Sequence, residues 1–167
     1  CGNIFRTPVT FRSVENISAE MKELIDEYGI EHFKFMDDIF TLHQNLEELC
    51  KEIGKLDIHY IAHTRSDLMT SEKAELLFKS GCVQSGLGVE SADNNVLKIN
   101  NKRETVEQHK EAIKILKKAG LRTKPYWMTG LPGETDETIE LNKQFMIDMQ
   151  PDKWTICTFT PYPGCAI

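Results

Sequence analysis

Polar and flexible residues follow each of five apolar segments, and these are the residues of the chain that could do chemistry. Asp37 and Asp38 follow HFKFM, Arg65 follows IHYIAHT, and Glu90 with Ser91 follows GLGV. The last two segments lead into turns rich in glycine and proline, namely TGLPGE with Gly130, Pro132 and Gly133, and TPYPG with Tyr162. Carboxylates and a guanidinium form charge-assisted hydrogen bonds, and glycine lets a backbone approach a ligand closely. Together they predict a site for a small charged ligand.

Each position also has a simpler interpretation. Asp38 can be an ordinary turn residue, Arg65 and Asp67 can form a structural ion pair, and GLPGE can be only a turn. Glu90 is harder to explain in this way, because a carboxylate that directly follows an apolar strand needs a partner. For Glu90 we therefore favour a binding or catalytic role.

Amphipathic helices alternate with short apolar strands along the whole chain. Ser13 is a candidate N-cap for the first helix, and Thr105 with Gln108 has the spacing of a capping box. Gly29, Gly54, Gly81 and Gly120 are placed to end helices. The predicted helices cover 14–28, 44–53, 70–81, 105–120 and 135–149, with a short helical turn after Glu90, and the predicted strands cover 32–36, 58–63, 83–89, 123–128 and 153–159.

This alternation predicts an α/β fold with parallel strands joined by right-handed crossovers. A doubly wound sheet and part of a βα barrel both fit, but no G-x-G-x-x-G motif follows any strand, which favours the barrel. Chemistry in βα barrels occurs at the carboxyl ends of the strands. We therefore expect Asp38, Arg65, Glu90, Gly130 and Tyr162 to surround one mouth.

Composition excludes several function classes. A net charge of −6 argues against bulk nucleic-acid binding. No apolar run is long enough to span a membrane. The five cysteines are scattered and odd in number, which is typical of a reducing cytoplasm. Cys50 and Cys157 are predicted to be small buried residues. The histidines show no zinc-binding spacing.

The motifs FRSVENI, FKFMDDIFTL, HTRSDL, GLGVES, MTGLPGET and TPYPG, in this order, resemble the core of radical S-adenosylmethionine (SAM) enzymes. The resemblance is to the cobalamin-binding-domain-associated and methylthiotransferase-like branches. It implies a partial (βα)6-type TIM barrel that lacks its first strand. We expect residues 1–167 to be a single core domain, truncated at the N-terminus and also at the C-terminus.

The resemblance also implies cofactors and roles. Cys1 matches the last cysteine of a C-x-x-x-C-x-x-C motif that holds a [4Fe–4S] cluster, whose reduced form splits SAM to a 5′-deoxyadenosyl radical or supports methyl transfer. Asp37 and Asp38 match positions near the SAM amino group, Arg65 suits a carboxylate, and Glu90 with Ser91 matches a position near the ribose or amino group. The remaining matches are Gly130, Pro132 and Gly133 near the adenosyl part and Tyr162 on the adenine or substrate side.

A flavodoxin or ferredoxin is the implied electron donor, and an upstream domain could supply cobalamin. One cysteine cannot hold the cluster, so the chain alone is predicted to be inactive. Two alternatives stay open: a non-catalytic βα module that binds a small anion at its rim, and a barrel enzyme that uses Glu90 as a base without a cluster. Trp127 and Met128 are more simply core residues than substrate contacts.

Overall fold

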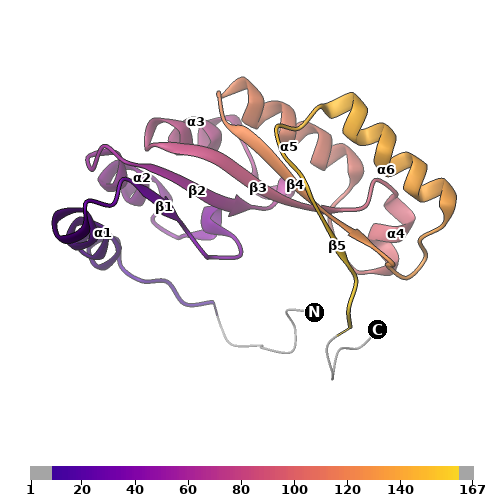
Figure 1. The fold of residues 1–167 in the computed structure, drawn as a ribbon, viewed down its shortest axis with the longest axis horizontal. Helices are drawn as coiled ribbons and strands as arrows, with labels where there is room; N and C mark the ends of the chain where they lie inside the picture. The colour runs from indigo at the N-terminus through magenta and orange to yellow at the C-terminus, as the bar shows by residue number, and fades with distance from the viewer. Residues whose placement is uncertain (1–8, 162–167) are drawn as a thin grey trace.

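Five parallel strands form one curled sheet in the computed structural model, which describes residues 9–161 (Figure 1). The strands lie side by side in chain order, so each crossover joins neighbours. They are β1 (His32–Lys34), β2 (His59–Thr64), β3 (Cys82–Glu90), β4 (Arg122–Thr129) and β5 (Thr155–Thr158).

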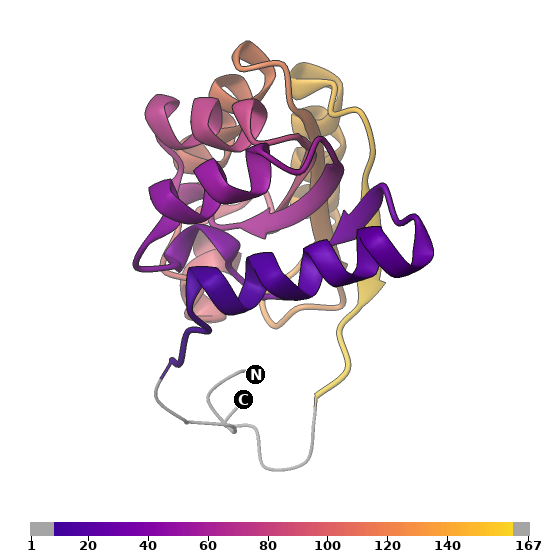
Figure 2. The same ribbon diagram turned by 90° about the vertical axis from the view of Figure 1, so that its left-hand side faces the viewer.

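Helices connect the strands and lie along the outer face of the sheet, where α3, α5 and α6 are visible in Figure 1 and α1 crosses the foreground of Figure 2. The α-helices are α1 (Val14–Tyr28), α2 (Leu46–Gly54), α3 (Ser71–Lys79), α4 (Asn94–Ile99), α5 (Val106–Lys118) and α6 (Asp136–Met149), and the 3-10 turns are η2 (Phe40–Leu42) and η3 (Ser66–Leu68).

The helix ends carry the capping interactions that the sequence predicts. The Ser13 side chain accepts the backbone N–H of Asn16 at the start of α1, and Gly29 ends that helix at a φ of 65°. Thr105 and Gln108 form the expected capping box at the start of α5. These local contacts set where each helix begins, and hence the length of the loop that leads to it from the preceding strand.

The core lies between the sheet and these helices. Alternate strand residues point into it, such as Tyr60 and Ala62 of β2 and Thr123 and Trp127 of β4, while Ile113 of α5 packs from the helix side. On β2 and β4, the residues between these buried ones are partly or fully exposed. The sheet therefore has one face packed on helices and one inner face.

The predicted partial TIM barrel of parallel strands is confirmed as a curled half-barrel whose strand carboxyl ends share one rim. The helix α2 ends at Gly54 as predicted, with Lys55 as a C-cap in right-handed helical conformation. One local prediction was wrong. Cys157 is exposed, because it lies on the edge strand β5 opposite Met128. None of the helices in residues 9–161 is long and apolar enough to span a bilayer.

Candidate functional site

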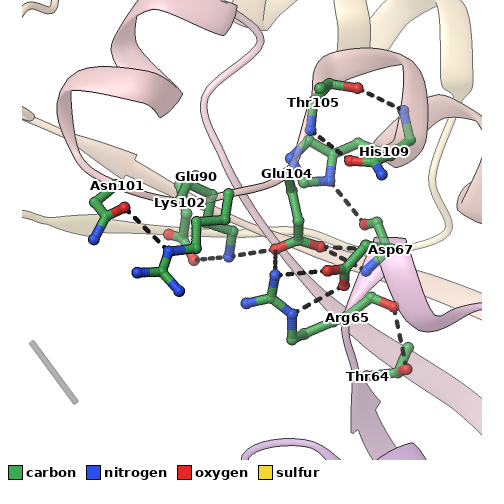
Figure 3. A network of polar contacts seen from close by, with 12 residues as sticks. Thr64, Arg65, Asp67, Glu90, Asn101, Lys102, Glu104, Thr105 and His109 are labelled. Atoms are coloured by element: carbon green, nitrogen blue, oxygen red, sulfur yellow. Dashed lines mark hydrogen bonds and ion pairs between the residues drawn. The ribbon is translucent and has the colours of Figure 1, made fainter. Parts of the chain in front are cut away.

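A charged network joins the carboxyl ends of β2 and β3 (Figure 3). Arg65 donates from Nε and Nη2 to the two carboxylate oxygens of Asp67, each at 2.9 Å. These hydrogen bonds are the main reason that the pKa of Asp67 is lowered and that of Arg65 is raised. The structural ion pair considered from the sequence therefore exists, and it fixes the guanidinium at the rim.

Glu104, on the segment between α4 and α5, holds this end of β2 in place. Its side chain is fully buried, and Oε1 accepts the backbone N–H of Ser66 at 2.7 Å. Oε2 lies 3.4 Å from Arg65 Nη2 and 3.3 Å from Lys102 Nζ, which are ion-pair distances. One buried carboxylate thus compensates two cations that come from different loops.

Lys102 extends the network to the end of β3. Its ammonium donates to Glu90 Oε1 at 3.3 Å, and both side chains are largely shielded from solvent. Glu90 has a φ of 65°, a left-handed conformation that is strained for a residue other than glycine, next to an irregularity in the β3–β4 register. A Cβ at Gly88 would lie 2.8 Å from Glu90 Oε1 and 2.9 Å from Lys102 Nζ, so a side chain there would displace the ends of this pair. Backbone strain of this kind concentrates at functional sites.

His109 lies beneath the same network. It is fully buried in α5, and its Nδ1 is 2.7 Å from the Ser66 hydroxyl. Burial, followed by the charge of Lys102, lowers the pKa of His109 to about 4. The imidazole is therefore neutral at pH 7 and supports η3 without adding a charge.

The turn after β4 forms the next part of the rim. The carboxylate of Glu134 accepts the Gly130 N–H at 2.8 Å and the Thr129 hydroxyl at 3.1 Å. Gly130 has a φ of 80°, and no atom lies within 4 Å of the position that a Cβ would take. The Pro132 carbonyl accepts a hydrogen bond from Asn100, which ties this turn to the end of α4. The backbone at Gly130 thus presents an open surface.

The other predicted site residues are less closely connected. Asp37 and Asp38 are exposed in the loop after β1. The charge of Asp38 raises the pKa of His63 on β2, but burial and the charges of Lys34 and Lys124 outweigh it and lower that pKa overall. Ser91 is buried and its hydroxyl accepts the Asp93 N–H. Gly133 is exposed beside Pro132, with a φ of 86°. Cys1 and Tyr162 lie outside the described residues.

Lys102 and Glu104 are the site residues that sequence reasoning missed. They stand in the run NNKRET, whose charges indicate a solvated loop before a helix. Burial of Glu104 depends on this loop folding under the rim of β2, a long-range contact that local patterns do not encode. The only local feature that could have pointed to a structural role for this run is its position directly before the helix cap Thr105.

The chemistry of the rim fits SAM better than it fits an iron–sulfur cluster. A guanidinium, a carboxylate and an open glycine backbone complement a ligand that carries a carboxylate, an ammonium and a nucleoside. The cysteines among residues 9–161 are Cys50, Cys82 and Cys157, and no group of metal-binding side chains occurs in that part of the chain. These residues cannot by themselves hold a cluster.

A βα half-barrel with a charged rim at its strand carboxyl ends defines the class as a TIM-barrel-like cofactor-binding fold. Residues 1–146 match the family model of the radical SAM superfamily, so the chain belongs to this superfamily. Membership implies a [4Fe–4S] cluster and SAM as cofactors, and it supports an enzyme rather than a non-catalytic module.

Two curated relatives show comparable similarity over most of the chain. An uncharacterized methyltransferase of Pyrococcus horikoshii is 33% identical over 156 residues, covering 91% of this chain and 34% of the relative. The anaerobic magnesium-protoporphyrin IX monomethyl ester cyclase of Rubrivivax gelatinosus is 32% identical over 157 residues, covering 91% and 28%. The chain thus spans about a third of these proteins' length.

Solved structures share the fold. The radical SAM methyltransferase TsrM of Kitasatospora setae, with cobalamin and a [4Fe–4S] cluster bound, superimposes with a TM-score of 0.77 at 19% identity, over 88% of this chain and 29% of TsrM. Coproporphyrinogen III oxidase of Escherichia coli gives a TM-score of 0.71 at 13% identity, over 93% and 40%.

Proposed function

We propose that this chain is the SAM-binding core of a cytoplasmic radical SAM enzyme, with the ligand held at the rim of the half-barrel. The observation that carries the proposal is the strained Glu90 at the carboxyl end of β3, which forms an ion pair with Lys102. Glu104 lies within ion-pair distance of both Lys102 and Arg65 and so connects the two strand ends. A network that orients two opposite charges on adjacent strand ends supports the binding of a zwitterionic ligand.

Each rim group keeps a binding atom available. Arg65 uses Nε and Nη2 within residues 9–161, so Nη1 can bind the methionine carboxylate of SAM. Glu90 uses Oε1 for Lys102, which leaves Oε2 for the ammonium or a ribose hydroxyl. The open side of Gly130 is suited to the adenosyl group. Asp37 and Asp38 remain proposed contacts for the amino end, and Ser91, Pro132, Gly133 and Tyr162 remain proposed parts of the pocket.

The cluster is proposed to depend on Cys1 and on two further cysteines ahead of it. We also propose residues 1–167 as one truncated core domain, with an electron donor such as flavodoxin or ferredoxin. The names of the relatives, a methyltransferase and a porphyrin ester cyclase, support methyl transfer or radical chemistry on the substrate. Cobalamin from an upstream domain is the corresponding proposal for a methyltransferase.

SAM binding tests the proposal directly. Isothermal titration with SAM should show that Glu90→Gln weakens binding about tenfold, because a charge-assisted hydrogen bond is lost. Glu47→Gln, which changes an exposed glutamate of α2 outside the rim network, is the matched control and should bind like the unmodified protein. Absence of SAM binding, or equal affinities for both variants, would overturn the proposal.

Iron–sulfur reconstitution tests the role of Cys1 separately. Under anaerobic conditions, the 167-residue chain should give no stoichiometric [4Fe–4S] signal in visible and EPR spectra. The protein expressed with its full natural coding sequence should give one. A stable cluster in the chain alone would refute the prediction that it lacks the required ligands.

A further inference from the structure

The inner face of the sheet carries basic side chains. Strand alternation places Lys34 of β1, His63 of β2 and Lys124 of β4 on this face, since their neighbours along each strand point into the helix-packed core. The register puts His63, Gly86 and Lys124 in one row across the sheet, and Lys34 pairs with Ile61, two residues before His63. Three of the four strands from β1 to β4 therefore contribute a basic group to one area.

Two aromatic rings hold this row together. The rings of His63 and Tyr126 lie 5.4 Å apart between centroids, and the Tyr126 hydroxyl is 3.5 Å from His63 Nε2. Lys124 Nζ lies 5.0 Å from the centroid of the Tyr126 ring, a cation–π contact. A Cβ at Gly86 would lie 2.8 Å from Tyr126 Cε2 and 3.3 Å from His63 Cδ2. Glycine is needed here so that both rings can lie across the strand.

In the described part of the chain, the two lysines of this area have no carboxylate within ion-pair distance. Within residues 9–161, neither Lys34 nor Lys124 forms a salt bridge, although the whole chain has 26 acidic and 20 basic residues. Burial, and then the charges of Lys34 and Lys124, lowers the pKa of His63. Among the described residues, the charge of Asp38 opposes this lowering. Positive charges gathered on one face of a curled sheet attract anions.

We propose that the inner-face cluster, defined as Lys34, His63, Lys124 and Tyr126, binds an anionic group of the substrate, a carboxylate or a phosphate, with the rings contacting the adjoining part of the molecule. The inference rests on the proposed function, because SAM at the rim leaves the inner face for the second reactant. The cluster lies on the strands below the rim network of Arg65, Glu90, Lys102 and Glu104, and it shares none of these residues.

Calorimetric titration with inorganic pyrophosphate and with tricarballylate, a tricarboxylate, tests the inference and distinguishes the two kinds of anion. The protein is expressed with its full natural coding sequence and titrated at low salt. At least one probe should bind, and Lys34→Met and Lys124→Met should each weaken it about tenfold. Raising the salt concentration should weaken it further. Lys114→Met, an exposed lysine on α5, is the control and should leave affinity unchanged.

SAM is titrated in the same samples so that the two proposals can fail independently. Unchanged SAM affinity in the Lys34 and Lys124 variants supports a separate substrate site, whereas weakened SAM binding would assign these lysines to SAM and overturn the inference. Failure of both probes to bind, or equal weakening by Lys114→Met, would also overturn it. If SAM does not bind but the anion results hold, the proposed function fails and the anion site stands.

Discussion

Glu104 is the residue whose replacement should disturb the rim most, because a single buried carboxylate serves four groups. It accepts the N–H groups of Ser66 and Asp67, and it lies within ion-pair distance of Arg65 and Lys102. Glu104→Ala removes all of these interactions at once. The alanine side chain cannot accept these hydrogen bonds. The positive charges of Arg65 and Lys102, which are largely shielded from solvent, then lose one of their carboxylate partners.

The size of the effect follows from burial. Breaking a buried ion pair by removing one partner costs about 3–5 kcal/mol of unfolding free energy. Arg65 keeps its bidentate contact with Asp67 and Lys102 keeps Glu90, so we expect a loss near the lower limit, about 3 kcal/mol. Glu104→Gln retains one acceptor oxygen for the Ser66 N–H and should cost less, about 1–2 kcal/mol.

Urea unfolding followed by circular dichroism measures both losses. Glu111→Gln, an exposed glutamate on α5, is the control and should change stability by no more than about 0.5 kcal/mol. SAM affinity measured on the folded variants should fall with Glu104→Gln, since Arg65 and Lys102 lose their common anchor. A Glu104→Ala variant as stable as the control would refute the role assigned to this carboxylate.

Three further outcomes are expected. The pKa of His109 is about 4 in the folded protein and about 6.5 when unfolded, so its contribution to stability is present above pH 6.5 and is lost as the pH falls toward 4. At pH 5 this loss is about 2 kcal/mol. Urea unfolding at pH 5 and pH 7 should therefore show a smaller difference in unfolding free energy between the two pH values for His109→Gln than for the unmodified protein. An equal pH dependence of the two proteins would contradict this assignment. Gly86→Ala should lower stability by about 1–3 kcal/mol and displace Tyr126, and an unchanged melting temperature would contradict that close approach. Within residues 9–161, β1 pairs only with β2 and leaves one edge unpaired, so light scattering on the 167-residue chain should detect association, and a clean monomer would count against it.

Local chemistry made much of this fold predictable. Ser13, Gly29 and Thr105 act through contacts within a few residues, so the ends of α1 and the start of α5 follow from the sequence. The alternation of elements predicted parallel strands, and hence a rim that gathers Arg65, Glu90 and Gly130 at strand ends.

Long-range packing set the limits of prediction. Glu104 stands in a charged run that looks solvated, yet it is buried because the loop folds beneath η3. Glu90 has a left-handed backbone, and its side chain pairs with Lys102, twelve residues away along the chain. Cys157 looked like a core residue, but its exposure depends on its place in the edge strand β5.

A crystal structure of the protein with SAM bound tests the central claim most directly. We predict the methionine carboxylate at Arg65, the ammonium or ribose at Glu90 and the adenosyl group along Gly130, all at the carboxyl ends of β2, β3 and β4. SAM bound at the opposite end of the strands, or on the helix-covered face, would contradict the account.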